Sequence, residues 1–309
     1  MLRLAMTTDA ETYERVREPL ADRGIDVCHV RAKERALHVS GDASRVSGDR
    51  VTATPDATGP TDEFDGFDVG FVYPTRLMEG AVVDTRLSVP WVNGREAVLT
   101  SRNKAGVLAA LDDAGLPTPR TVMLSNPVSE SVVADAVAEL SYPVVVKPNS
   151  ATRGVGVAAA HDLDSLLGIV DYLNLVHDYR ATGDKSYLIQ EYLPDACDYR
   201  AMVVDGDYAG AVRRELPDDA LAVGRWKHNV HRGAEATGID LPDRARELAE
   251  RAAETLDIDY LGVDLLETDG RLVVNETNAR PTVDAATKYE PDFYDRLAAV
   301  VERAVENGR

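Results

Sequence analysis

Residues 1–95 alternate short apolar runs with polar stretches that have helical spacing. The runs LRLAMTT, IDVCHVR, FDVGFVYP and VPWVN have the length of strands, and helices are expected over residues 9–21 and 75–86. Residues 40–65 are rich in Gly, Ser, Thr, Asp and Pro, which predicts a loop. The pattern predicts a small α/β domain that ends near residue 95. This region has neither a GxGxxG nor a GxxxxGK[ST] motif, so its likeness to nucleotide-binding sheets is one of topology only.

The rest of the chain mixes helices with hairpins. Helical spacing predicts helices over residues 95–113, 128–140, 242–256 and 292–307. Apolar runs predict a strand, a glycine loop and a second strand across residues 142–160, and a further strand at 187–193. Residues 201–215 indicate a hairpin that turns at Asp205-Gly206, and residues 216–238 read as a polar loop.

A second hairpin carries three oxygen-bearing side chains. The segment GVDLLETDGRLVVNETN, residues 262–278, contains two apolar strands joined by an Asp-Gly turn. Side chains on one face of a strand recur every second residue, so Glu276 and Asn278 share a face, and the hairpin brings Asp264 toward them. Carboxylate and amide oxygens suit Mg²⁺, which predicts a magnesium site held against a nucleotide. A solvated hairpin with scattered acids is the alternative in a chain this acidic.

The composition adds a strong acidic bias. The 309 residues contain 53 acidic and 34 basic side chains, a formal net charge of -19, and only six lysines: Lys33, Lys104, Lys147, Lys185, Lys227 and Lys288. An acidic, lysine-poor surface favours adaptation to high salt over an ordinary acidic protein. Because a polyanion needs a basic patch and none is evident, nucleic acid is not an expected partner.

Compartment and redox chemistry follow from what the sequence lacks. No run approaches the roughly 20 apolar residues of a membrane helix, and the N-terminus has no long apolar stretch of a signal peptide. We therefore expect a cytoplasmic protein without a membrane partner. Cys28 and Cys197 lack metal-ligand spacing, so neither a disulfide framework nor a zinc site is expected.

The segment PVVVKPNSATRGVGV, residues 143–157, joins an apolar strand to a loop of small residues. Gly154 and Gly156 let backbone amides approach a phosphate closely, and Lys147 supplies a positive charge. A hairpin with a mobile turn is the alternative. The position of Lys147 inside the apolar strand favours phosphate binding, because a buried unpaired ammonium is costly.

Polar groups elsewhere suggest further contacts to a nucleotide. Gln190 and Glu191 end a strand that presents backbone groups suited to an adenine edge, with a carboxylate available for ribose hydroxyls, although an edge strand with incidental polarity looks similar. The loop GRWKHNVHRGAEA offers a HxxH pair, His228 and His231, but anion binding is the better interpretation. Three arginines precede it on the strands: Arg200, Arg213 and Arg214.

The ordered series of Lys104, KPNSATRGVGV, LIQEYL, CDYRAMVV, RWKHNVHRG, GVDLLE and NETN resembles the ATP-grasp superfamily, specifically the RimK-like amino-acid ligases, over about residues 95–309. The resemblance implies an α/β fold of α+β subdomains, residues 96–190 and 191–309, that grip ATP between them. Residues 1–95 would form a Rossmann-like domain in front of them. Such enzymes form ADP while a carboxylate becomes an acylphosphate, which an amine then attacks to give an amide.

The resemblance also assigns roles to residues. Lys104 and Lys147 would contact phosphates beneath the glycine loop, Gln190 and Glu191 would form the adenine hinge, and Asp198 would lie on the ribose side. Two magnesium ions, or manganese, would bind Asp264, Glu276 and Asn278. The residues assigned near the phosphates or the carboxylate substrate are Arg213, Asn229 and Arg232.

Two departures from the family pattern affect the substrate. The glycine loop reads NSATRGVGV rather than GSxGxGV, which adds the charge of Arg153. The metal strand continues as NARPT rather than NxSPG, so we predict that Arg280 takes part in acyl-acceptor recognition and that the substrate is not a ribosomal protein.

The leading hypothesis is a ligase that joins small-molecule carboxylate and amine substrates, adding glutamate or another amino acid to a small molecule, a coenzyme or a protein terminus. A kinase on the same fold and a non-catalytic nucleotide-binding module are the alternatives. Relatives imply a homo-oligomer, either a dimer or a tetramer.

Overall fold

The computed structural model describes residues 1–8, 10–37, 39, 64–151, 154–176, 185–228, 230 and 233–308. Most of the predicted loop over residues 40–65 lies outside the described residues. Arg153 and His231 do as well.

The N-terminal region is a parallel sheet, as its βαβ-type sequence pattern predicts. Its strands are β1 (Leu2–Met6), β2 (Ile25–His29), β3 (Val69–Phe71) and β4 (Trp91–Val92), in the order β2-β1-β3-β4. Its helices are α1 (Ala10–Ala21) and α2 (Leu77–Leu87). Because all strands run in parallel, their carboxyl ends meet at one edge, where the loops of this sheet form a cavity described below.

The helix predicted over residues 95–113 is in fact two helices. They are α3 (Arg95–Arg102) and α4 (Lys104–Asp113), and they meet at Asn103. The side chain of Asn103 accepts a hydrogen bond from the backbone N–H of Gly106 and so caps α4. This break places Lys104 at the start of a new helix.

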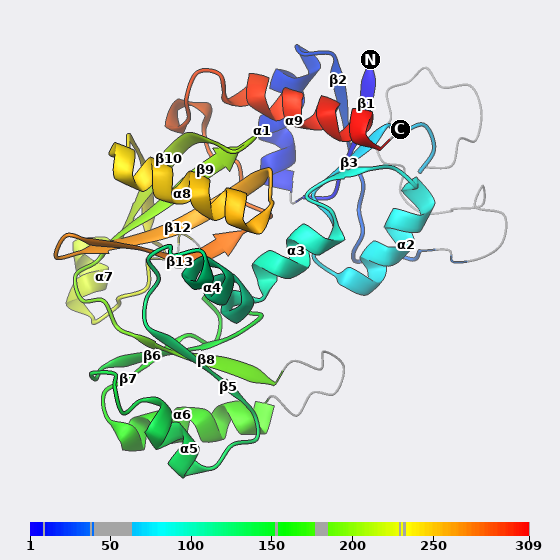
Figure 1. Ribbon diagram of the computed structural model, residues 1–309. Coiled ribbons are helices and arrows are strands. Elements are labelled where there is room, and N and C mark those ends of the chain that lie inside the picture. The colour runs from blue at the N-terminus through cyan, green and yellow to red at the C-terminus, as the bar shows by residue number, and fades with distance from the viewer. Residues whose placement is uncertain are drawn as a thin grey trace.

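The central region is an antiparallel sheet with its own core. Its strands are β5 (Thr121–Ser125), β6 (Val144–Pro148), β7 (Ala158–Ala160) and β8 (Ser186–Glu191), in the order β5-β8-β6-β7. Two helices, α5 (Glu130–Ala136) and α6 (Leu163–Val176), pack on the face turned away from the rest of the molecule (Figure 1). The sequence analysis did not predict α6, although its segment is rich in Leu, Ile and Val.

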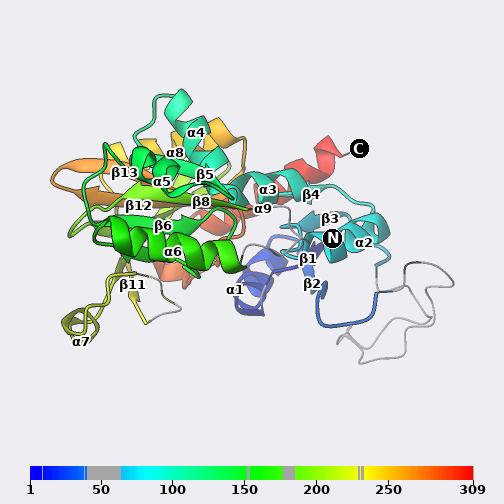
Figure 2. The same ribbon diagram turned by 90° about the horizontal axis from the view of Figure 1, so that it is seen from below.

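The C-terminal region is a larger antiparallel sheet. Its strands are β9 (Cys197–Val204), β10 (Asp207–Glu215), β11 (Glu235–Ile239), β12 (Tyr260–Thr268) and β13 (Arg271–Asn278), in the order β11-β10-β9-β12-β13. The helices are α7 (Asp218–Ala222), α8 (Asp243–Leu256), the 3₁₀ helix η2 (Ala286–Lys288) and α9 (Phe293–Asn307). Both hairpins are confirmed, since Asp205, Gly206, Asp269 and Gly270 all have the positive φ of a tight turn. The stretch predicted as a polar loop contains α7 and most of β11, which project from one end of the molecule in Figure 2.

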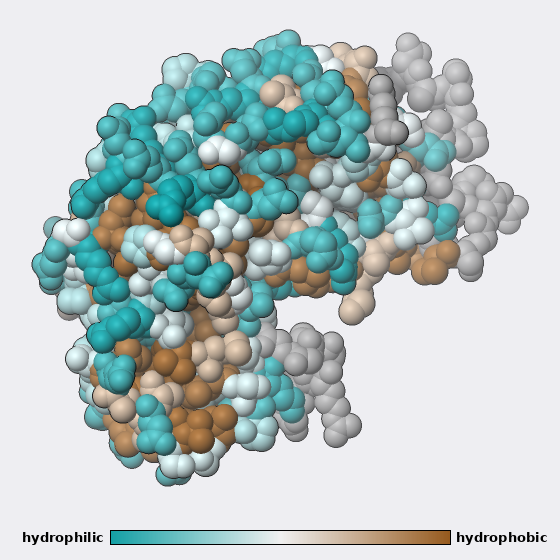
Figure 3. All heavy atoms as spheres, in the orientation of Figure 1, coloured by the Kyte–Doolittle hydropathy of each residue, from teal (hydrophilic) through white to brown (hydrophobic). Residues whose placement is uncertain are grey.

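Two large hydrophobic cores organise these sheets, and two smaller clusters are also present in the described residues. The N-terminal and C-terminal sheets share one core with α8 and α9, whereas the central sheet packs with α5 and α6 around another. In Figure 3 the lobe that holds the central sheet is set off from the larger body by a concave outline. No helix in the described ranges combines the length and apolarity that a membrane crossing needs.

Candidate active site

The β12-β13 hairpin brings together the three predicted metal ligands. In the register of the two strands, Asp264 lies directly opposite Glu276, and Asn278 lies opposite Gly262. Directly opposed residues share a face, so two carboxylates and one amide gather on the same side of the hairpin. Nowhere in the described ranges, this hairpin included, do three His, Cys, Asp or Glu side chains come together as a metal-binding group.

Asp264 is buried and held by two arginines. Its cross-strand neighbour on β9 is Arg200, whose Nε and Nη2 donate to the two carboxylate oxygens at 2.7 and 2.8 Å. Arg214 Nη2 lies 3.1 Å from the same carboxylate. Burial works to raise the pKa of Asp264, but the two guanidinium groups outweigh it, and the pKa falls to about 2. This carboxylate is therefore ionised at any physiological pH.

Arg214 also binds Asp198, so one guanidinium lies between two carboxylates. Its Nε donates to Asp198 Oδ1 at 2.9 Å, across the β9-β10 register. Burial raises the pKa of Asp198 to about 6, since Arg214 offsets only part of the desolvation and the charge of Asp264 raises the pKa further. Asp198 thus holds Arg214 in position beside Asp264.

The structure places Arg214, and not the predicted Arg213, beside Asp264. Arg213 lies on the opposite face of β10, where it is opposite Tyr199 and pairs with Glu215 at 2.8 Å. Successive side chains of a strand point to opposite faces, so only one of the two adjacent arginines can face Asp264. Arg200 and Arg214 are the arginines of this site.

Lys104 connects the C-terminal hairpin to the glycine loop. Its ammonium is nearly buried, lies 3.0 Å from Glu276 Oε1, and donates to the carbonyl of Ala151 at 2.6 Å. Because Asn103 starts α4 at this point, the lysine side chain projects from the first turn of the helix into the site.

Lys147 makes a second connection between the sheets. From β6 it donates to Gln190 Oε1 at 3.0 Å and to Asn275 Oδ1 at 3.3 Å, and Gln190 in turn donates to Thr121 Oγ1 at 2.8 Å. Burial lowers the pKa of Lys147 to about 8, with the charge of Glu276 opposing that change. Among the residues that the structure describes, no carboxylate contacts this ammonium, so it is suited to bind an anion.

The backbone of the glycine loop requires glycine at two positions. Gly154 and Gly156 both have positive φ, and a Cβ at Gly156 would lie 2.7 Å from Pro148 Cγ, so a side chain would collide there.

Glu191, in the predicted adenine hinge, is paired with protein groups. Its carboxylate accepts from the Arg120 backbone N–H at 2.7 Å and lies 2.7 Å from Arg271 Nη2. These contacts orient the carboxylate, and its role toward ribose hydroxyls remains a prediction.

Arg280 extends from the end of the hairpin to the N-terminal sheet. Its guanidinium donates to the carbonyls of Thr7 at 3.2 Å and Val72 at 3.0 Å, and also to Tyr73. Its backbone N–H donates to Asn278 Oδ1 at 2.9 Å. Arg280 therefore links the predicted metal strand to the carboxyl edge of the N-terminal sheet.

The structure describes only part of the loop GRWKHNVHRGAEA, residues 224–236, which was predicted to bind an anion. His228 Nδ1 lies 2.9 Å from the carbonyl of Arg214, and Lys227 Nζ donates to the carbonyl of Val157, beyond the glycine loop. These contacts bring the loop beside the same site. Asn229 and Arg232 lie outside the described residues, so their roles remain predictions.

Comparison with known proteins identifies the family. A model of the RimK-like ATP-grasp domain matches residues 101–297. A probable alpha-L-glutamate ligase of Klebsiella pneumoniae (strain 342) is 30% identical over 216 residues, 69% of this chain and 67% of that protein. A ribosomal protein bS6–L-glutamate ligase of Escherichia coli O139:H28 is 29% identical over 199 residues, 64% of this chain and 62% of that one.

Solved structures share the fold. D-cycloserine synthetase DcsG superposes with a TM-score of 0.70 at 19% identity, covering 98% of this chain and 99% of that one. D-alanine–D-alanine ligase from Bacillus anthracis, complexed with ATP, gives a TM-score of 0.65 at 15% identity, covering 99% and 98%. The predicted ATP-grasp fold is thus confirmed. Since the family model covers more than half of the sequence, the chain belongs to the RimK-like ATP-grasp family and is an ATP-dependent ligase.

Proposed function

We propose that this protein activates a small-molecule carboxylic acid as an acylphosphate and joins it to the amine of an amino acid, with glutamate the first amine to test. The observation that carries the proposal is the meeting of Lys104, Lys147, Asp264 and Glu276, which come from four elements of the central and C-terminal regions. The names of the two glutamate ligases above support the choice of amine.

The residues present fit magnesium. Asp264, Glu276 and Asn278 offer hard oxygen donors on one face, and carboxylate oxygens retain lone pairs beyond those used by Arg200 and Lys104. Bound there with ATP, the metal would neutralise charge that develops on the transferred phosphoryl group.

The side chains of the protein contribute to phosphoryl transfer by positioning the reactants and by supplying positive charge. Lys104 and Lys147 supply cations where the phosphates would lie, and the glycine turns allow backbone N–H groups to approach them. Gln190 holds Lys147 in position. Arg200 and Arg214 keep Asp264 ionised and oriented. Phosphoryl transfer to a carboxylate needs no protein nucleophile, so this set is chemically sufficient.

The test is ADP release by the purified protein with ATP and Mg²⁺ across panels of acids and amines. ADP formation that requires both an acid and an amine supports the ligase. ADP formation that depends on a hydroxyl compound alone would identify a kinase. ATP binding without turnover across both panels would identify a binding module.

A variant at the hairpin tests the metal assignment. Glu276→Gln should reduce ADP formation at least about 100-fold, because it removes a charged ligand, while the circular dichroism spectrum stays that of the native protein. Glu302→Gln, an exposed position on α9, makes the same chemical change away from the site and should leave the rate unaltered. Retained activity in Glu276→Gln would remove this residue from the metal site.

A further inference from the structure

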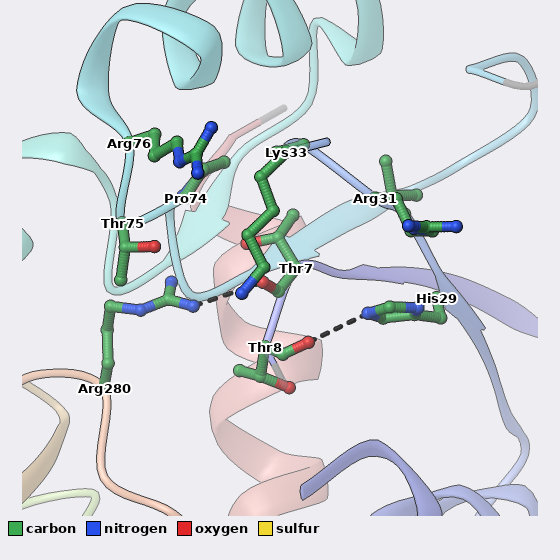
Figure 4. A pocket seen from close by; sticks show the side chains of 11 residues that line it. Thr7, Thr8, His29, Arg31, Lys33, Pro74, Thr75, Arg76 and Arg280 are labelled. Carbon is green, nitrogen blue, oxygen red and sulfur yellow. Dashed lines mark hydrogen bonds between the residues drawn. The ribbon is translucent and has the colours of Figure 1, made fainter. Parts of the chain in front are cut away.

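A cavity of about 240 Å³ opens at the carboxyl edge of the N-terminal sheet. It is formed by the residues that follow β1, β2 and β3, and Arg280 enters it from the C-terminal region (Figure 4). In open parallel sheets the carboxyl edge is where neighbouring loops separate and leave space for a ligand. The position alone makes it a candidate binding site.

The walls of the cavity carry a concentration of positive charge. Arg31, Lys33, Arg76 and Arg280 line it, and none of the described lining residues is acidic. In a chain with 53 acidic and 34 basic residues, chance would surround most cavities with carboxylates. Arg76 has an acidic neighbour, Glu79 at 3.4 Å, but both side chains are well exposed and such a pair contributes little. Positive charges that line one cavity favour an anion there.

Arg280 connects the cavity to the proposed reaction site. This residue is two positions beyond Asn278, a distance of at most about 7 Å along the backbone, and its guanidinium is fixed by the carbonyls of Thr7 and Val72. A small molecule whose carboxylate lies at the metal hairpin would therefore extend toward the N-terminal sheet.

We propose that this cavity binds a second anionic group of the acid substrate, so that the enzyme acts on carboxylic acids that carry another carboxylate or a phosphate at the far end. The inference rests on the proposed ligase function for the orientation of the acid. Arg31, Lys33 and Arg280 provide the charge. Carboxylate and phosphate present the same charged oxygens to these groups, and the experiment separates them.

Binding is measured by calorimetry without ATP or metal, at one fixed ionic strength. Glutarate is compared with butyrate, and 3-phosphoglycerate with glycerate, because each pair differs in the second anionic group. We expect the doubly anionic member of at least one pair to bind tenfold or more tightly, and the pair that shows it identifies carboxylate or phosphate. Equal affinities within both pairs would overturn the proposal.

Two variants place the binding in this cavity. Arg31→Gln, at an exposed position, should weaken binding of the preferred dianion at least about tenfold. Arg251→Gln, an exposed charge on α8, is the matched control and should bind as the wild type does. Unchanged affinity in Arg31→Gln would overturn the proposal.

Kinetics connect the cavity to the reaction. Arg31→Gln should raise the KM for the acid tenfold or more and leave the KM for ATP unchanged. An unchanged KM for the acid would overturn the substrate assignment. The calorimetry does not depend on catalysis, so a failure of the ligase proposal in the ADP assay is distinguishable from a failure of the cavity.

Discussion

At the scale of single residues, the site is defined by how its buried charges are balanced. Asp264 and Arg214 are buried, Asp198 is partly buried, and Arg200 supplies the second positive charge, so the two carboxylates are matched by two guanidinium groups. The charge of Lys147 is balanced differently, because its ammonium donates to the neutral oxygens of Gln190 and Asn275. Burial of this ammonium costs free energy, which a bound phosphate would offset.

The pH dependence of stability should report this cost. Because burial lowers the pKa of Lys147 from 10.5 to about 8, the unfolded chain holds this proton more tightly, and stability should rise as pH increases between those values. Below pH 8 the full penalty remains. Lys147→Met should therefore be more stable at pH 7, by up to about 3 kcal/mol, and should lose ATP-dependent turnover.

Urea unfolding at several pH values checks this prediction. The stability difference between Lys147→Met and the wild type should shrink as the pH rises from 8 toward 10.5. Lys33→Met removes an exposed lysine and should leave the same pH profile as the wild type. Equal stability of Lys147→Met and wild type at every pH would contradict the assigned cost.

At the scale of elements, the end of the β12-β13 hairpin is joined to the N-terminal region by hydrogen bonds between side chains and backbone. Asn93, just beyond β4, donates to the carbonyl of Ala279 at 2.7 Å and to that of Tyr260. Ser101 on α3 accepts from the backbone N–H of Ala279 at 2.9 Å. These bonds fix the loop from which Arg280 projects, so they position the link between the reaction site and the cationic cavity.

Asn93→Ala should destabilise the protein by about 2–4 kcal/mol, because it leaves two buried carbonyls without this donor. Part of the loss will come from the backbone, since Asn93 has a φ of 51° that alanine tolerates poorly. Ser88→Ala measures that part alone, because Ser88 is exposed and has a φ of 49°. Chemical denaturation of both variants gives the difference. Equal losses in the two would show that the hydrogen bonds of Asn93 contribute nothing.

At the scale of the whole molecule, a single core unites the N-terminal and C-terminal sheets, while the central sheet has a separate core. The proposed nucleotide site lies between these two bodies and is crossed by few contacts, among them the polar bonds of Lys104 and Lys147. The whole chain has a formal net charge of -19. Most ion pairs of the described residues use arginine as the basic partner. Self-repulsion of this size opposes the folded state when it is not screened.

Melting temperature should therefore increase with salt. Raising NaCl from about 0.1 M to about 1 M shortens the screening length from roughly 10 Å to roughly 3 Å, which removes most repulsion between surface carboxylates. Sucrose at matched water activity is the control, since it favours the compact state without screening charge. A melting temperature that is flat across the salt series, or that rises equally in sucrose, would contradict adaptation to high salt.

Local sequence patterns were sufficient for much of the fold and part of the site. The β12-β13 hairpin follows from strand alternation and the Asp269-Gly270 turn, and both are properties of adjacent residues. The same holds for the positive φ of Gly154 and Gly156. The break of α3 and α4 at Asn103 and the helix α6 were missed, because helical spacing continues across the first and the second is a nearly continuous apolar run.

The sequence by itself determined which residue types carry the chemistry, and the tertiary structure decided which of two adjacent arginines belongs to the site. Counting outward from the Asp205-Gly206 turn, regular pairing of β9 with β10 would set Arg213 opposite Asp198. A β-bulge between Tyr208 and Gly210 shifts the register by one residue and puts Arg214 there instead. The bulge occurs where the backbone of Tyr289 approaches Gly210 so closely that a Cβ would lie 2.7 Å from its Cα. A contact between residues so far apart in the chain leaves no periodic signal in the sequence, yet a one-residue shift reverses the face of every side chain beyond it.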